Sequence, residues 1–288
     1  MSVTTRNASA KNEAQHIRRG GHWAIYLFLI VVALLQLLPF FLAINTSMKP
    51  GDDLSSTLLP RLYDIQWDNW SRAISEGQIL VSIKNSVVVT LFTTLLVCVL
   101  GAAAAYPLAR RRTKGNAIVS SLILAMMMIP PLSILVPLYT LMVDMGGVNT
   151  YWGIILVLTA TNLPLSVFLY TAFIKAIPEA VDEAGMIDGA NRFIIFTRLI
   201  LPMLKPVTAT VVIMTGTSVW NDYALSNYIL TDASAQTIAP RVASFFSANA
   251  NSLGLAASSA LIAALPIVVA YLFLQKYFIA GMIAGVEK

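Results

Sequence analysis

The side chains that could do chemistry fall into two groups, at residues 177–202 and 215–223. The first group is rich in carboxylates, and the second combines hydroxyl, amide and aromatic side chains. Catalytic groups are scarce, because the only histidines are His16 and His22 and the only cysteine, Cys98, lies in an apolar stretch. No Gly-Lys dipeptide is present, so the chain has no Walker A loop for ATP. The sequence therefore predicts no catalytic residue, no metal site and no cofactor in this chain.

The first group predicts a short helix with carboxylates at its beginning. Pro178 suits a first helical turn, and the acids that follow it complement the positive end of the helix dipole. Ala180, Ala184 and Ile187 recur at helical spacing, so they share one small apolar face. Gly189 is placed where the helix should end in a sharp turn. A flat alanine face suits a cleft in another protein better than a lipid surface.

The second group lies at the end of a long apolar segment and has the chemistry of a sugar site. A helix from Lys205 to Asn221 would rise about 24 Å, which places the group in the outer half of a membrane. An indole can stack on a sugar ring while amide and carboxylate groups bind its hydroxyls. The alternative is that these residues cap the helix end at the membrane interface. The candidate substrate-pathway residues are Thr217, Trp220, Asn221, Asp222 and Tyr223.

The composition identifies the chain as an integral membrane protein. Hydrophobic residues make up 57% of it, charged residues 11%, and the mean hydropathy is +0.75. We expect an all-α bundle with six membrane-spanning helices, each long enough to cross a hydrocarbon core of about 30 Å. The expected spans are 23–45, 86–109, 117–142, 151–174, 206–229 and 257–279. They form one domain, 23–280, with a disordered tail at 1–22 and a second tail at 281–288.

Lys and Arg residues set the predicted orientation. With six spans, fourteen of the nineteen basic residues fall on the side of the termini and of residues 177–202, and five on the opposite side. The positive-inside rule therefore places both termini and residues 177–202 in the cytoplasm. The net charge of +5 thus reflects topology, and no nucleic-acid partner is expected.

Glycine and proline residues predict local features of the bundle. The small residues 101–105 permit close helix contact. Pro130, Pro131 and Pro137 should kink the third span, and residues 144–147 should form a tight outer turn. Between the spans, residues 67–74 are expected to form an amphipathic helix at the outer interface, and residues 231–256 a polar outer loop.

Short motifs in the chain resemble those of a known family. Residues 177–202 contain Glu183-Ala184-Gly185, Asp188-Gly189-Ala190 and Leu201-Pro202. This pattern resembles the EAA loop of membrane subunits in binding-protein-dependent ABC importers, most closely the carbohydrate (maltose-type) branch. Further matching residues are Asn85-Ser86, Ala105-Tyr106-Pro107-Leu108-Ala109-Arg110, Met128-Ile129-Pro130 and Trp220-Asn221-Asp222. Gly185 departs from the usual Ala, and Leu199 from the usual Ile; Gly185 should soften the helix by up to ~1 kcal/mol.

The resemblance implies a type I importer permease that spans a bacterial or archaeal plasma membrane. It would pair with a second, different permease subunit, two ATP-binding subunits that hold ATP and Mg, and an extracytoplasmic solute-binding protein. Glu183 would pair with a basic residue of the ATPase. The ATPase-coupling residues implied are Glu179, Ala180, Glu183, Ala184, Gly185, Asp188 and Gly189.

An ion-coupled secondary transporter or channel is the alternative. That class uses intramembrane acids or histidines and often shows repeats, whereas this chain offers only Asp222 at membrane depth and no visible repeat. The motif at 177–202 would also stay unexplained. The sequence therefore favours the permease of a sugar importer and leaves the identity of the sugar open.

Overall fold

The computed structural model describes the backbone of residues 4–50, 53, 64–248 and 252–284, and most side chains between residues 23 and 275. Every regular element in these residues is a helix. Four helices are long and apolar enough to cross a membrane: α1 (Thr4–Ser47, apolar part Ile25–Ser47), α3 (Ile79–Arg110), α6 (Tyr151–Ala176) and α13 (Leu253–Ala284, apolar part Leu253–Phe273).

Two bent pairs bring the candidate spans of the described residues to six. One joins α4 (Lys114–Met127) to η1 (Pro131–Ile134) and α5 (Leu135–Asp144); the other joins α8 (Arg192–Ile194), η2 (Ile195–Ile200) and α9 (Leu201–Met203) to α10 (Lys205–Trp220). Short helices fill the ends: α2 (Asp68–Gly77), α7 (Ala180–Ile187), α11 (Ala224–Ile229) and α12 (Ile238–Ala248). The predicted all-α architecture is confirmed, and the described residues hold four candidate spans, or the predicted six where each bent pair counts as one span.

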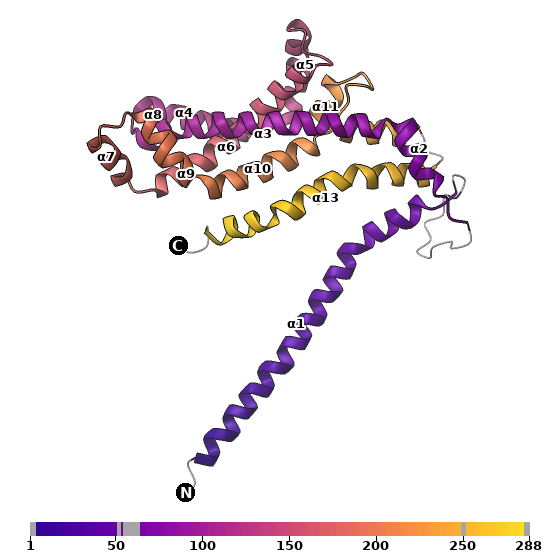
Figure 1. Cartoon of the computed structure of the whole chain (residues 1–288), viewed down its shortest axis with the longest axis horizontal. Coiled ribbons are helices and arrows are strands. Elements are labelled where there is room, and N and C mark those ends of the chain that lie inside the picture. Colours follow the sequence, from indigo (N-terminus) through magenta and orange to yellow (C-terminus); the bar gives the residue numbers. More distant parts are fainter. Residues whose placement is uncertain (1–3, 51–52, 54–63, 249–251, 285–288) are drawn as a thin grey trace.

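Helices α3, α6, α10 and α13 lie side by side and form the body of the molecule (Figure 1). Helices α3 and α6 approach each other closely at Gly101. A Cβ atom there would overlap the Oγ of Ser166, which donates a hydrogen bond to the carbonyl of Val97 at 3.1 Å. The small residues at 101–105 therefore permit close helix contact, as predicted.

Helix α1 leaves this body. Figure 1 shows it diverging from α13, and no residue in its most apolar window is buried. Its end is fixed by Asn69 of α2, whose Nδ2 donates to the carbonyls of Ser47 and Lys49 at 3.0 and 2.8 Å. The tail predicted as disordered is helical from Thr4, because an existing helix extends without a nucleation cost and Ala, Lys, Glu and Arg are good helix formers.

The third and fifth spans are broken rather than kinked. In the third, the backbone of Pro130 is extended and α5 turns 98° away from α4, because proline disfavours a helical residue before it. Pro137 causes no bend, since it lies in the first turn of α5, where its missing N–H is not needed. The fifth candidate span is the bent pair of Arg192–Met203 and Lys205–Trp220, whose two parts meet at 74°, and α11 begins at Ala224 as a separate helix. The bounds predicted for this span, 206–229, are therefore wrong at both ends.

The end of the molecule that carries α2 is more helical than predicted. The amphipathic helix at 67–74 is confirmed as α2, and the tight turn at 144–147 by Gly146, with φ +69°. The segment 231–256, predicted to be a polar loop, contains α12, which buries Ile238 and Phe245. These two residues are seven positions apart on one helical face, a pattern that the many Ser, Ala and Asn residues obscured.

At the C-terminal end of the chain, α13 continues to Ala284, into the segment predicted to be a tail. Residues 285–288 lie outside the described part.

Candidate functional site

Helix α7 lies at one end of the body, beyond the ends of the long helices (Figure 1). Asp182 and Glu183 occupy its first turn, as the helix dipole favours. At its end the N–H of Ala190 donates to the carbonyl of Gly185 at 3.0 Å, while Gly189 adopts φ +80°. This left-handed glycine ends the helix in the sharp turn that the sequence predicted.

The surface of α7 is largely exposed. Of the residues predicted to couple to an ATPase, Glu179, Ala180, Glu183, Ala184, Asp188 and Gly189 are exposed, and Gly185 is buried. Two apolar side chains beside them stand in solvent, Met186 at 49% and Ile187 at 86% exposure. An exposed helix tip with apolar and acidic side chains together is typical of a protein-binding surface.

Gly185 has a packing role that the sequence did not indicate. A Cβ atom at this position would lie 2.9 Å from Cδ1 of Leu199 and 3.0 Å from Cγ1 of Ile195. The glycine thus lets α7 approach η2 closely. Leu199, the second departure from the family pattern, is one of the two side chains against which it packs.

Asp182 points away from solvent and binds its own chain. Its Oδ1 accepts a hydrogen bond from the hydroxyl of Tyr106 at 2.6 Å, and its Oδ2 accepts one from Nε of Arg110 at 2.9 Å. Nη1 of Arg110 donates to the carbonyls of Ile174 and Ile177, both at 3.0 Å. The side chains of Arg110 and Asp182 are only 8% and 11% exposed. We call Tyr106, Arg110 and Asp182 the Asp182 network.

Sequence reasoning missed this network, because it grouped Asp182 with the exposed acids that begin the helix. The available signal was the spacing of its partners. Tyr106 and Arg110 are four residues apart on α3, so both side chains lie on one face at the end of that helix.

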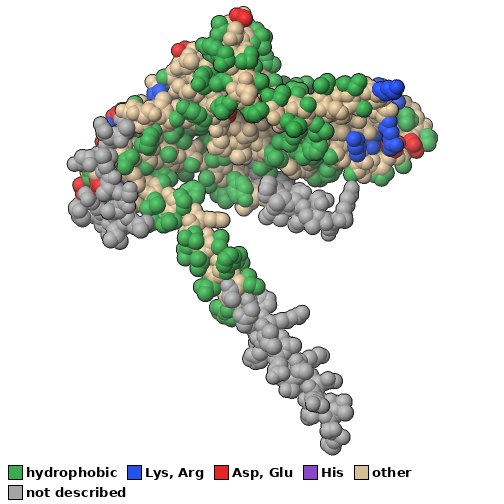
Figure 2. Space-filling view, turned by 180° about the vertical axis from the view of Figure 1, so that it is seen from behind, with side chains coloured by type: hydrophobic (Ala, Val, Ile, Leu, Met, Phe, Trp, Pro, Cys, Tyr) green, Lys and Arg blue, Asp and Glu red, His purple; other side chains and the backbone are tan. Residues whose placement is uncertain are grey.

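Several basic side chains lie near α7, among them Arg110, Arg112 and Arg192. Figure 2 shows Lys and Arg gathered at the end of the body where α3 ends and α7 lies. A small cleft of about 120 Å³ beside α7 is lined by the Asp182 network together with Glu179, Glu183, Met186, Arg192 and Ile195. Nη2 of Arg112 lies 3.8 Å from Oε1 of Glu179, but the two side chains are 92% and 59% exposed. Solvent screens such an ion pair, so it contributes little to the stability of the fold.

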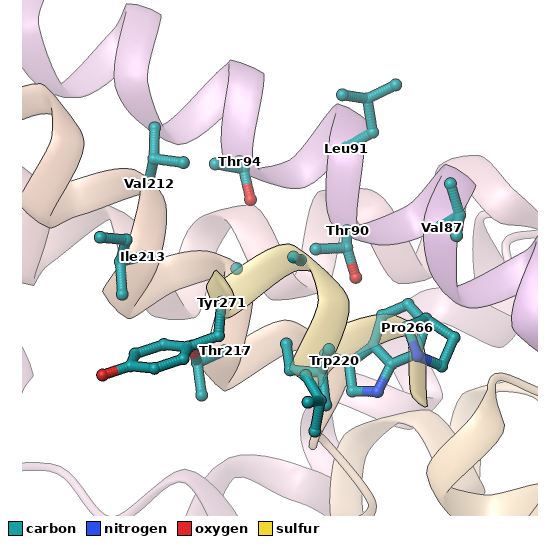
Figure 3. Close-up of a pocket in the computed structure, with 14 residues that line it drawn as sticks. Val87, Thr90, Leu91, Thr94, Val212, Ile213, Thr217, Trp220, Pro266 and Tyr271 are labelled. Atoms are coloured by element: carbon teal, nitrogen blue, oxygen red, sulfur yellow. The ribbon is translucent and has the colours of Figure 1, made fainter. Parts of the chain in front are cut away.

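The second predicted group does not form one site. Thr217 and Trp220 line a groove of about 520 Å³ between α3, α10 and α13 (Figure 3). Asp222 instead accepts hydrogen bonds at Oδ2 from the N–H and hydroxyl of Ser226, at 2.8 and 2.7 Å, and so caps α11. Asn221 donates to the carbonyl of Thr217 at 2.9 Å, and Tyr223 is half exposed. Asp222 therefore binds the first turn of α11 and is not among the residues that line the groove.

The groove is mainly apolar, with a few hydroxyl groups. Figure 3 shows the hydroxyls of Thr90 and Thr94 on α3 facing toward Trp220 and Tyr271. The Oγ1 atoms of both threonines are buried and have no hydrogen-bond partner in the structure. The groove is thus lined by an indole, a phenol ring and mostly apolar side chains, without a carboxylate.

Comparison with known proteins finds relatives over almost the whole chain. Residues 97–284 match the family described as "Binding-protein-dependent transport system inner membrane component". The chain is 44% identical over 266 residues to the melibiose/raffinose/stachyose import permease protein MelC of Bacillus subtilis (strain 168), covering 92% of this chain and 96% of that protein. It is 32% identical to the multiple sugar-binding transport system permease protein MsmG of Streptococcus mutans serotype c (strain ATCC 700610 / UA159), covering 91% and 96%.

The fold also resembles a solved structure. A chain in the crystal structure of a bacterial ABC transporter involved in the import of the acidic polysaccharide alginate superposes with a TM-score of 0.73. The two chains are 21% identical, and the match covers 90% of this chain and 97% of the other. The likeness to that structure concerns the fold.

Proposed function

The chain belongs to the family of binding-protein-dependent transport system inner membrane components, and we propose that it is a permease subunit of an ATP-driven sugar importer. The family match and the names of the relatives favour this function over an ion-coupled transporter. The observation that carries the proposal is α7, a helix at one end of the body whose outer surface exposes acidic and apolar side chains together. Such a helix gives a separate ATPase a surface to hold.

Helix α7 couples ATP hydrolysis to movement of the spans. Closure of two ATP-binding subunits, which hold ATP and Mg, displaces α7 and switches the spans between inward-facing and outward-facing arrangements. Glu183 pairs with a basic residue of the ATPase, and the exposed Ile187 and Met186 fill an apolar part of its cleft. A charge-assisted pair at a rim suits a contact that must form and separate reversibly.

The chain forms half of the pathway, beside a second, different permease subunit. The uncovered apolar surface of α1 supports a neighbour in the membrane, protein or lipid. An extracytoplasmic solute-binding protein delivers the sugar at the end where α2, α11 and α12 lie. Two observations support a cytoplasmic position for α7 and both termini. Basic residues are in excess on that side of the predicted topology. Helix α1 also begins, and α13 ends, away from the end of the molecule that carries α2 (Figure 1). The membrane is the plasma membrane of a bacterium or an archaeon.

The proposed substrate is an oligosaccharide of the melibiose, raffinose and stachyose kind. This follows from the 44% identity with a permease named for these sugars. Within the chain, Trp220 and Thr217 line the groove and provide a ring to stack on a sugar and a hydroxyl to bind it. The residues that follow Trp220 at the end of α10 are proposed to lie at the outer mouth of the pathway. They are Asn221, Asp222 and Tyr223.

The function is tested by purifying the chain from its native membrane in mild detergent and measuring ATP hydrolysis. We expect a second six-span protein and an ATP-binding subunit to co-purify, and hydrolysis to rise when a binding protein loaded with raffinose is added. Maltose serves as the control sugar. Purification of the chain without any ATP-binding subunit, from cells that take up the sugar, would contradict the proposal.

A further inference from the structure

We propose that Asp182 is a positioning residue that fixes α7 to α3 and α6, so that a displacement of α7 becomes a displacement of the spans. The inference rests on the proposed function and adds to it an internal attachment for the coupling helix. Glu183 faces the partner, whereas Asp182, the preceding residue, faces its own chain. Neighbouring residues on a helix point about 100° apart, so one short helix can serve both directions.

The Asp182 network joins three helices through one carboxylate. Tyr106 and Arg110 bring α3 to Oδ1 and Oδ2 of Asp182 on α7. Arg110 also donates to the carbonyls of Ile174 and Ile177, where α6 ends. The last carbonyls of a helix lack the usual partner four residues on and carry the negative end of its dipole, so a cationic donor is well matched there. The carbonyl of Ile174 also accepts a hydrogen bond from the N–H of Ile177 at 3.1 Å.

The remaining contacts of α7 are apolar and do not fix its orientation as hydrogen bonds do. Helix α7 has eight residues, too few to be stable by itself, and its apolar packing is against η2 through Gly185. Apolar packing permits sliding, whereas charged hydrogen bonds fix both distance and angle. The side chains of Arg110 and Asp182 are nearly excluded from water, so solvent does not screen their attraction as it does for Arg112 and Glu179.

Helix α3 extends from the network to the opposite end of the body. It is continuous for 32 residues, and at its other end Asn85 donates to the carbonyls of Ser234 and Gln236, both at 2.9 Å. The next residue, Ser86, accepts a hydrogen bond from the N–H of Ile238 at 2.7 Å. A displacement at the Asp182 network is thereby passed by a single helix to the segment before α12.

The test compares sugar moved per ATP hydrolysed in the complete transporter, reconstituted in lipid vesicles with its binding protein. Asp182→Asn keeps the shape of the side chain and removes its charge. Arg112→Gln is the matched control, because it removes an exposed arginine two positions from Arg110. We expect Asp182→Asn to assemble and to hydrolyse ATP, while its sugar-to-ATP ratio falls at least about fivefold, as loss of coupling between sites would give. Arg112→Gln should keep the wild-type ratio.

An unchanged ratio in assembled Asp182→Asn would overturn the inference. Should this variant fail to assemble, Tyr106→Phe decides, because it removes one hydroxyl and leaves the ion pair: a lowered ratio supports the positioning role and a wild-type ratio overturns it. A residue that only stabilised the fold would lower the yield of complex and leave the ratio unchanged. Failure of the proposed function is distinct, since the wild-type complex would then show no sugar-stimulated hydrolysis.

Discussion

Glu183 and Asp182 are adjacent acids with opposite surroundings. Glu183 is exposed at the surface of α7, whereas Asp182 is buried against Tyr106 and Arg110. The same residue type at neighbouring positions therefore has different consequences when substituted. The proposed roles predict that loss of Glu183 weakens the contact with the ATPase, whereas loss of Asp182 weakens the contact of α7 with its own chain.

Glu183→Lys should leave the permease folded and abolish sugar-stimulated ATP hydrolysis, because it places a positive charge against the basic residue that Glu183 is proposed to meet. Because Glu183 is at the protein surface, reversing its charge should weaken binding to the ATPase and leave the stability of the fold unchanged. Hydrolysis by the reconstituted complex, with and without the loaded binding protein, measures the effect. Full stimulation in the variant would exclude the role assigned to Glu183.

Gly101→Ala should destabilise the chain by about 1–3 kcal/mol, the usual cost of overpacking a close contact. The added Cβ would overlap Ser166 and force α3 away from α6. Gly216→Ala is the control, because the nearest atoms to its Cβ, on Thr90 and Thr94, are 3.9 Å away. Thermal unfolding in detergent should show a lower midpoint for the first variant alone; equal midpoints would contradict the packing.

Helical elements were predictable from the sequence where apolar periodicity and length agreed. Spans α3, α6 and α13, the short helix α7 and its end at Gly189 all follow from such patterns. The breaks within spans could not be predicted, because apolar composition does not reveal whether a helix bends slightly at a proline or ends there. Helix α12 was missed because two apolar residues in a segment of Ser and Ala give little signal.

Only part of the candidate site could be predicted from the sequence. The exposed face of a helix follows from its own periodicity, whereas the burial of a side chain depends on helices that are far away in the sequence. The exposed acids of α7 needed only its own periodicity. The burial of Asp182 depends on Arg110, 72 residues earlier, and the division of the second group depends on Asp222 capping α11. Pairings at such separations cannot be read from local patterns.

Trp220→Ala tests the groove between α3, α10 and α13. Removing the indole should lower sugar uptake about two- to tenfold, the equivalent of the 0.5–1.5 kcal/mol that an aromatic contact adds, and leave ATP hydrolysis without sugar intact. Trp23→Ala is the control, because Trp23 lies on α1, 77% exposed and outside the groove. Equal uptake by both variants and the wild type would remove Trp220 from the pathway.

The whole molecule places its proposed partners at opposite ends. Helix α7 and most of the Lys and Arg side chains that the structure describes lie at one end of the body (Figures 1 and 2). Helices α2, α11 and α12 lie at the other end, and α3 runs between the two ends. The apolar surface of α1 is left uncovered between these ends. This arrangement suits a subunit that receives mechanical work at one face of a membrane and opens a path at the other.

The central claim, that α7 contacts a separate ATPase, is tested most directly by site-specific crosslinking. The only native cysteine is Cys98, so Cys98→Ser gives a cysteine-free chain into which Ile187→Cys, at a side chain 86% exposed, places a single thiol. In membranes that transport the sugar, a thiol-to-amine crosslinker should join this position to an ATP-binding subunit, identified by mass. Trp67→Cys, at the opposite end, should not capture that subunit. A transporting membrane in which Ile187→Cys captures no ATP-binding subunit would contradict the account.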